Sequence, residues 1–94
     1  MEKIHYNIVV KGSVQGVWFR KFTKENADKL NLYGFVKNEL EGTVYIEAEG
    51  VTEVLEQFID RLRIGSPLSK VSEVIFESTE FQHYTTFEIR RTKV

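Results

Sequence analysis

Two glycines and an arginine near the start of this 94-residue sequence have the types and spacing that could bind an anion. Gly12-Ser13-Val14-Gln15-Gly16 lies between a segment with strand periodicity and a segment with helix periodicity. Glycine lets the backbone approach a ligand closely, and the first N–H groups of a helix have no partner within it, so such a loop suits a phosphoryl group. Arg20 could bind the same anion because its planar guanidinium matches phosphate oxygens. The two glycines also fit a simple turn, so on this pattern both interpretations stay open.

The sequence contains no pattern typical of metal binding or of nucleophilic catalysis. It has no cysteine, which excludes disulfides, thiolate metal sites and cysteine nucleophiles. His5 and His83 are far apart and have no Asp or His at ligand spacing, so we expect both to be solvated. Glu47 and Glu49 are expected on the solvated side of a strand. We therefore expect no metal and no cofactor.

The charged residues are segregated along the chain. The formal net charge is −1 at pH 7, from 13 Lys and Arg and 14 Asp and Glu. Residues 1–38 carry a balance of +4, whereas residues 39–94 carry a balance of −5. A net charge near zero argues against a surface for polyanions, but the basic segment fits a site for one small anion.

Size and composition indicate a single globular domain over residues 1–94, with 41% hydrophobic and 29% charged residues. No apolar run reaches the ~20 residues that a membrane-spanning helix needs. The first residues lack the apolar run and the cleavage site of a signal peptide. We therefore expect a cytoplasmic protein without membrane contact.

Hydrophobic periodicity predicts the elements that would position the loop and Arg20. Alternation of apolar residues from Ile4 to Val10 predicts a strand before the loop, and helical spacing predicts a helix over Phe19–Leu30 after it. The further predicted elements are strands over Tyr33–Lys37 and Thr43–Glu49, a helix from about Thr52 to Gly65-Ser66-Pro67, and strands over Val71–Phe76 and Phe87–Ile89. This β-α-β-β-α-β order with a short final strand predicts a ferredoxin-like α/β sandwich, an antiparallel sheet with two helices on one face.

One alternative function on this fold is RNA binding. Tyr33-Gly34-Phe35-Val36 overlaps the aromatic strand motif of RNA-recognition modules. The basic residue and the glycine of that motif are replaced by Asn31 and Leu32, and the segment falls on the second strand instead of the third. We therefore expect no nucleic-acid partner.

The residues quoted so far resemble the signatures of the acylphosphatase family. The segment from Gly12 to Arg20, with its Val14-Gln15-Gly16-Val17-Trp18-Phe19-Arg20 string, resembles that family's signature loop. Gly34-Phe35-Val36-Lys37-Asn38, followed by Glu41-Gly42-Thr43-Val44, resembles its second signature. The length and the order of elements also fit, so the resemblance covers nearly the whole chain.

The resemblance implies hydrolysis of acyl phosphates to a carboxylate and inorganic phosphate without a metal or cofactor. It implies that a loop of Gly12, Ser13, Val14, Gln15, Gly16, Val17 and Trp18 cradles the phosphate with backbone amides. Arg20 would bind the phosphate, and Asn38 would hold the attacking water. Inorganic phosphate is then expected as product and inhibitor, the substrate as a small molecule, and the protein as a monomer.

Three positions depart from the commoner family pattern. Asn31 stands where a helix-ending glycine is usual, and both residue types tolerate a positive φ. Glu41 stands where Asp or Asn often precedes the turn glycine, and Ser13 replaces a basic residue. None of these changes removes a proposed catalytic group. A second alternative is an anion-binding module without activity, because acylphosphatase-like domains also occur as parts of larger maturation proteins.

Overall fold

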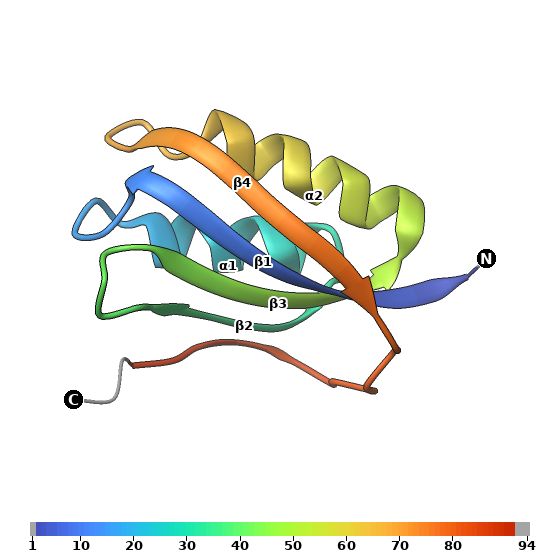
Figure 1. The fold of residues 1–94 in the computed structure, drawn as a ribbon. Helices are drawn as coiled ribbons and strands as arrows, with labels where there is room; N and C mark the ends of the chain where they lie inside the picture. Colours follow the sequence, from blue (N-terminus) through green and yellow to red (C-terminus); the bar gives the residue numbers. More distant parts are fainter. Residues whose placement is uncertain (1, 92–94) are drawn as a thin grey trace.

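A computed structural model describes residues 2–91 and places the helices and strands in the predicted order (Figure 1). The elements are β1 (Lys3–Ser13), α1 (Phe19–Lys29), β2 (Tyr33–Asn38), β3 (Val44–Val51), α2 (Thr52–Ile64), β4 (Lys70–Thr79) and β5 (Phe87–Ile89). The short last strand and the start of α1 fall at the predicted residues, whereas β1 and β4 are longer than predicted.

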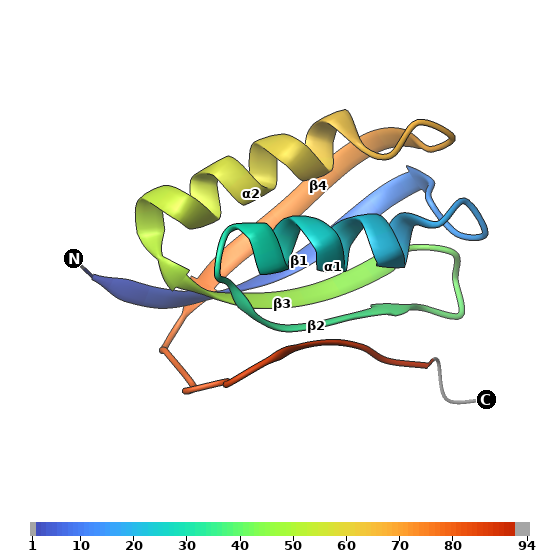
Figure 2. The same cartoon turned by 180° about the vertical axis from the view of Figure 1, so that it is seen from behind.

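The strands form one sheet in the order β4-β1-β3-β2-β5, and both helices cover the same face of it (Figure 2). The predicted ferredoxin-like sandwich is thereby confirmed, but the sheet is not wholly antiparallel, because β2 and β5 run parallel. β4 ends at the end of the sheet where β2 begins, as Figure 1 shows. Residues 80–86 cross from one edge to the other at that end, so the last strand enters beside β2 in the same direction.

Strand β1 is longer than predicted because its pairing with β4 continues through a bulge. The register shifts between Lys11 and Gly12, and Gly12 has a φ of 130°. A Cβ atom at Gly12 would lie 2.0 Å from the Lys70 carbonyl oxygen, so only glycine fits there without displacement of the backbone. The structure therefore places Gly12 and Ser13 in the strand, not in the predicted loop.

The core lies between the helices and the covered face of the sheet. In the β1–β3 register Ile8 lies opposite Ile46 and Val10 opposite Val44, and all four side chains are buried. The helices contribute the buried side chains Phe19, Ala27, Leu55, Phe58, Ile59 and Leu62. The predicted apolar faces of the first and third strands and of the second helix are confirmed.

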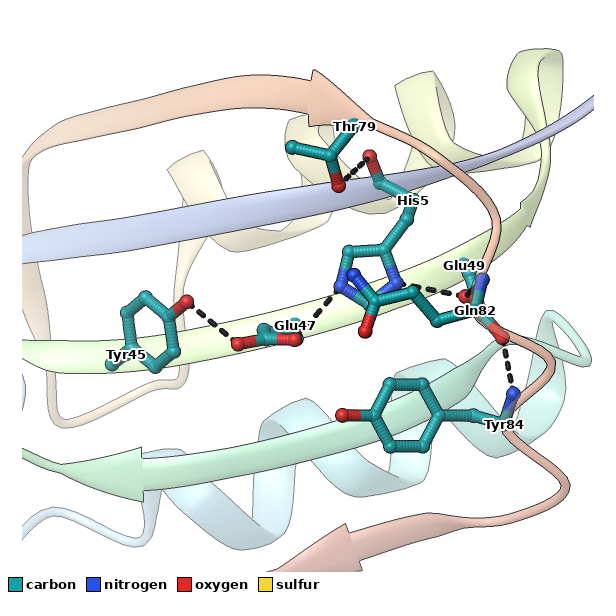
Figure 3. Close-up of polar contacts among 7 residues, drawn as sticks. All are labelled: His5, Tyr45, Glu47, Glu49, Thr79, Gln82 and Tyr84. Atoms are coloured by element: carbon teal, nitrogen blue, oxygen red, sulfur yellow. Dashed lines mark hydrogen bonds and ion pairs between the residues drawn. The ribbon is translucent and has the colours of Figure 1, made fainter.

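The opposite face of the sheet carries a buried polar cluster around His5 (Figure 3). Nδ1 of His5 lies 2.7 Å from a carboxylate oxygen of Glu49, and Nε2 lies 2.8 Å from one of Glu47. His5 and Glu49 are fully buried, and Glu47 is largely buried. The prediction that these three side chains are solvated is wrong, whereas His83 is exposed as predicted.

Residues 80–86 cover the polar cluster around His5. Glu49 accepts hydrogen bonds from the backbone N–H groups of Gln82, at 2.8 Å, and of Tyr84, and the Tyr84 ring stacks on His5. On the other side, the Tyr45 hydroxyl donates a hydrogen bond to Glu47 at 2.7 Å. Burial, together with the neighbouring Glu47 carboxylate, raises the pKa of Tyr45 above its ordinary value, so this hydroxyl keeps its proton. The cluster thus fastens the crossing segment that leads to β5.

We expect Glu49→Gln to lower the free energy of unfolding by about 3 kcal/mol, because His5 would lose a buried carboxylate partner. Urea denaturation followed by circular dichroism measures the change. Glu88→Gln is the matched control, since the Glu88 carboxylate makes an exposed contact with Arg90 at 3.2 Å and should change stability by less than about 0.5 kcal/mol. Equal losses in the two variants would contradict the assignment.

Candidate functional site

The structure brings Arg20 and Asn38 to one cleft of about 500 Å³ at the N-terminus of α1. The residues lining this cleft are Val14, Gly16, Trp18, Phe19, Arg20, Lys21, Asn38 and Ile89. Among these described residues the charged side chains are Arg20 and Lys21, and none is acidic. The cleft therefore has the electrostatics of an anion site.

Asn38 reaches the cleft because of its position in β2. It lies opposite Val44 in the register, as Val36 lies opposite Ile46, so these residues share the face that the helices cover. Asn38 is the last residue of the strand, and its side chain is half-buried beside the start of α1. Strand alternation therefore directs the carboxamide toward the helix.

Arg20 lies in the first turn of α1, where its charge opposes the helix dipole. Phe19 beside it is buried and fixes the helix on the core, while Arg20 stays half-buried at the cleft. Nη1 of Arg20 lies 3.4 Å from the Arg90 carbonyl oxygen, just beyond β5. In the described chain, this first turn contains no acidic residue and no side chain caps it. Its N–H groups and the guanidinium therefore present positive charge on the same side.

The loop before α1 contributes Val14, Gly16 and Trp18 to the cleft. Gly16 has a φ of 73° and open space where a Cβ would stand, which leaves its backbone accessible. Gly12 and Ser13, in β1, are not among the lining residues, and Val17 faces a neighbouring pocket.

Gln15, predicted as part of the loop, braces the β2–β3 hairpin with its side chain. Its amide nitrogen donates hydrogen bonds to the carbonyl oxygens of Glu39, at 2.7 Å, and of Thr43, at 2.8 Å. These carbonyls flank the turn of the β2–β3 hairpin, directly after Asn38. Gln15 thus joins the loop to the hairpin that carries Asn38.

Glu41, the departure from the family pattern in this hairpin, forms part of the turn. A hydrogen bond from its own backbone N–H and one from the Thr43 hydroxyl lower the pKa of its carboxyl group. The ionised carboxylate is therefore occupied within the hairpin, and it is not among the residues that line the cleft.

Sequence reasoning missed Lys21 and Ile89 as residues of the cleft. Lys21 follows Arg20, and nothing in the sequence distinguishes it from the other basic residues of the segment 1–38. Ile89 comes from β5, about 70 residues farther along the chain, and its place beside Arg20 depends on the parallel pairing with β2. No local signal in the sequence carries that information.

Two alternatives, a metal site and RNA binding, can be compared with residues 2–91, where Tyr33 of the aromatic strand motif is 42% exposed. Among residues 2–91, no group of three or more His, Cys, Asp and Glu side chains is placed to hold a metal ion. Phe35, which an RNA base would need as a stacking surface, is buried under the Arg90 guanidinium, 3.9 Å from the ring centre. Neither α1 nor α2, the helices of this part of the chain, is long and apolar enough to cross a membrane.

The acylphosphatase family model matches residues 6–89. The chain belongs to the acylphosphatase family. An acylphosphatase of Bacillus licheniformis is 47% identical over 92% of this chain and 97% of its own length. An acylphosphatase of Archaeoglobus fulgidus is 41% identical, with 92% and 97% covered.

This acylphosphatase-family chain superposes on solved structures of acylphosphatases and on segments of larger proteins. The crystal structure of acylphosphatase from Bacillus subtilis superposes with a TM-score of 0.91 at 40% identity, covering 93% of this chain and 98% of that one. Full-length HypF, solved in its phosphate- and nucleotide-bound form, superposes with a TM-score of 0.89 at 33% identity. The match covers 97% of this chain but 12% of HypF. The family fold therefore occurs alone and as part of a longer chain.

We expect Gln15→Ala to lower the free energy of unfolding by about 1 kcal/mol, because two carbonyl oxygens that each keep one backbone donor would lose their second donor. Hydrogen exchange at the Gly42 amide, which bonds to the Glu39 carbonyl oxygen at 3.1 Å, should become faster as the hairpin loosens. Gln82→Ala, at an exposed glutamine away from the cleft, is the control and should leave both measurements nearly unchanged. Unaltered exchange at Gly42 in the Gln15 variant would refute the bracing role.

Proposed function

We propose that this chain is an acylphosphatase that hydrolyses the carboxyl–phosphate bond by attack of a positioned water, without a metal. The observation that carries this is the convergence of Arg20, Asn38 and the first turn of α1 on one cleft, whose lining among residues 2–91 includes no acidic side chain. Phosphoryl transfer needs positioning and charge stabilisation more than covalent catalysis, and such a cleft can supply both.

In this proposal the phosphoryl oxygens bind to the backbone N–H groups of the loop ending at Trp18 and of the first turn of α1. Arg20 binds the same oxygens through its guanidinium and stabilises the charge that builds up on them in the transition state. Gly16 favours this arrangement, because nothing occupies the space beside its backbone. The contact of Arg20 with the Arg90 carbonyl holds the guanidinium near the cleft until substrate arrives.

Asn38 has the role of holding the attacking water. Its carboxamide oxygen can accept a hydrogen bond from water, and a neutral amide does not repel the phosphate as a carboxylate would. The water oxygen forms a bond to phosphorus, and the bond between phosphorus and the acyl oxygen breaks with its electron pair on the carboxylate. The water proton passes to the phosphate or to solvent. Because a carboxylate is a leaving group of low pKa, no general acid is required.

A monomeric state, a cytoplasmic location and inhibition by phosphate remain predictions that accompany this proposal. Inhibition follows from the chemistry, since the product phosphate would occupy the same amides and the same guanidinium as the substrate.

The wild-type protein should hydrolyse benzoyl phosphate, monitored by its ultraviolet absorbance, at the same rate with and without EDTA. Inorganic phosphate should inhibit competitively, because both ligands would use the same site. Loss of activity in EDTA that added metal restores would contradict the metal-free mechanism. Phosphate binding without any hydrolysis would favour the alternative of an anion-binding module. The match to a segment of the longer HypF chain is compatible with that alternative.

Arg20→Gln and Asn38→Ala should impair different steps. We expect Arg20→Gln to lower kcat/KM by about 1000-fold and to abolish inhibition by phosphate, because the anion would lose its charged ligand. Asn38→Ala should lower kcat by about 100-fold and leave the inhibition constant of phosphate within about twofold. Arg63→Gln, at an exposed arginine on α2, is the control for charge. An Asn38 variant with wild-type kcat would rule out the water-holding role.

A further inference from the structure

A second pocket of about 380 Å³ adjoins the cleft. We call it the side pocket, and its lining residues are Val17, Trp18, Lys21, Phe22, Glu25, Ser66, Pro67 and Leu68. Trp18 and Lys21 line both the cleft and the side pocket, so the two hollows meet at this pair. A ligand bound in the cleft can therefore extend past Trp18 without crossing the core.

One hydrogen bond joins the two walls of the side pocket, and a second one lies within one wall. One wall is the start of α1, and the other is the loop between α2 and β4. The Ser66 hydroxyl donates to the Val17 carbonyl oxygen at 3.3 Å, and the Ser69 hydroxyl donates to the Ser66 carbonyl oxygen at 2.9 Å. The side pocket is thus built into the fold, between two segments about 50 residues apart in sequence.

Two large apolar side chains at the side pocket are exposed. Trp18 is 73% exposed and Leu68 is 71% exposed, and because both line one hollow they form an apolar surface of the kind that marks a ligand site. Trp18 also has a φ of 61°, a conformation that residues with bulky side chains rarely adopt. Backbone of this kind is concentrated at ligand sites, where the surroundings hold it in place. The backbone therefore holds the exposed Trp18 side chain where the two hollows meet, and packing in the core does not account for this position.

The charges at the side pocket favour an uncharged ligand group. Lys21 and Glu25 carry opposite charges, so the pocket offers no excess charge to an ionic terminus. The Lys21 ammonium lies 5.8 Å from the Trp18 ring centre, which engages it with the indole. The remaining lining residues are apolar except for Ser66, and such a surface suits an alkyl or aromatic group; they are Val17, Trp18, Phe22, Ser66, Pro67 and Leu68.

We propose that the side pocket binds the acyl group of the substrate and that the enzyme prefers acyl phosphates with extended apolar chains. This rests on the proposed function, since the cleft must hold the phosphoryl group. A substrate anchored there projects its acyl chain past Trp18 toward Leu68. Trp18 and Leu68 are then the residues that determine specificity, while Arg20 and Asn38 act on the phosphoryl group common to all substrates.

The inference predicts that kcat/KM rises with acyl chain length. Complete burial of one methylene group changes an equilibrium about fourfold, and a surface pocket that covers it partly should give about twofold. Hexanoyl phosphate, with four more methylene groups than acetyl phosphate, should therefore have a kcat/KM at least about tenfold higher. Equal values for acetyl, butanoyl and hexanoyl phosphate would overturn the inference and leave the proposed function intact. Absence of hydrolysis for all three would count against the proposed function itself.

Leu68→Ser tests the side pocket without altering the cleft. We expect it to lower kcat/KM for hexanoyl phosphate about three- to fivefold and to leave the value for acetyl phosphate within about twofold. Ile64→Ser is the matched control, because Ile64 is 81% exposed and lines neither hollow, and it should change neither value. A loss that is the same for both substrates, or the same in both variants, would overturn the assignment.

A binding measurement gives an answer that does not depend on turnover. The chain contains a single tryptophan, so its fluorescence reports on Trp18 alone. Hexylphosphonate should bind at least about tenfold more tightly than methylphosphonate and shift this emission to shorter wavelength, because the alkyl chain would cover the indole. The same affinity for both phosphonates, or an emission that hexylphosphonate leaves unchanged, would overturn the inference. In Leu68→Ser the advantage of hexylphosphonate should shrink about three- to fivefold.

Discussion

The antiparallel register between β1 and β3 decides what lies on each face of the sheet. Ile8 opposite Ile46 places apolar pairs under the helices, and the alternate pair of His5 with Glu49 then lies on the other face. Because side chains alternate with a period of two, a shift of one residue would bring the charged pairs into the core. The core and the polar cluster are therefore two results of one alignment.

The candidate site depends on the same alignment. Val10 pairs with Val44, and Val44 pairs with Asn38, so β1 and β2, with β3 between them, finish at the same end of the sheet. The loop that follows β1 and the hairpin that precedes β3 consequently lie at the same end of the sheet. Gln15 joins them through two hydrogen bonds, and α1 begins directly after the loop. An anion site made of backbone amides needs this arrangement, because the amide N–H groups stabilise an anion only when the fold fixes their direction toward it.

Local signals in the sequence predicted much of this site, and the remainder depends on contacts between distant segments. Arg20 and Asn38 each occur in a short motif, next to a helix start or a strand end, and the structure places both at one cleft. The burial of His5 and Glu49 was predicted wrongly, because residues 80–86 cover them and have no periodicity that marks their path. The bracing bonds of Gln15 were missed for a related reason, since their acceptors are backbone carbonyls of the hairpin, which no side-chain pattern identifies.

The first strand of the chain, β1, lies inside the sheet between β3 and β4, and this affects when the sheet can form. Both neighbours of β1 are made much later, as residues 44–51 and 70–79. β1 therefore stays without its sheet partners until residues 44–79 have been synthesised, and closing such long loops slows assembly. Residues 12–20 are synthesised early, but the cleft they line is completed by Asn38 and by Ile89 of the last strand. The candidate anion site is therefore complete only after β5 has been synthesised and paired with β2.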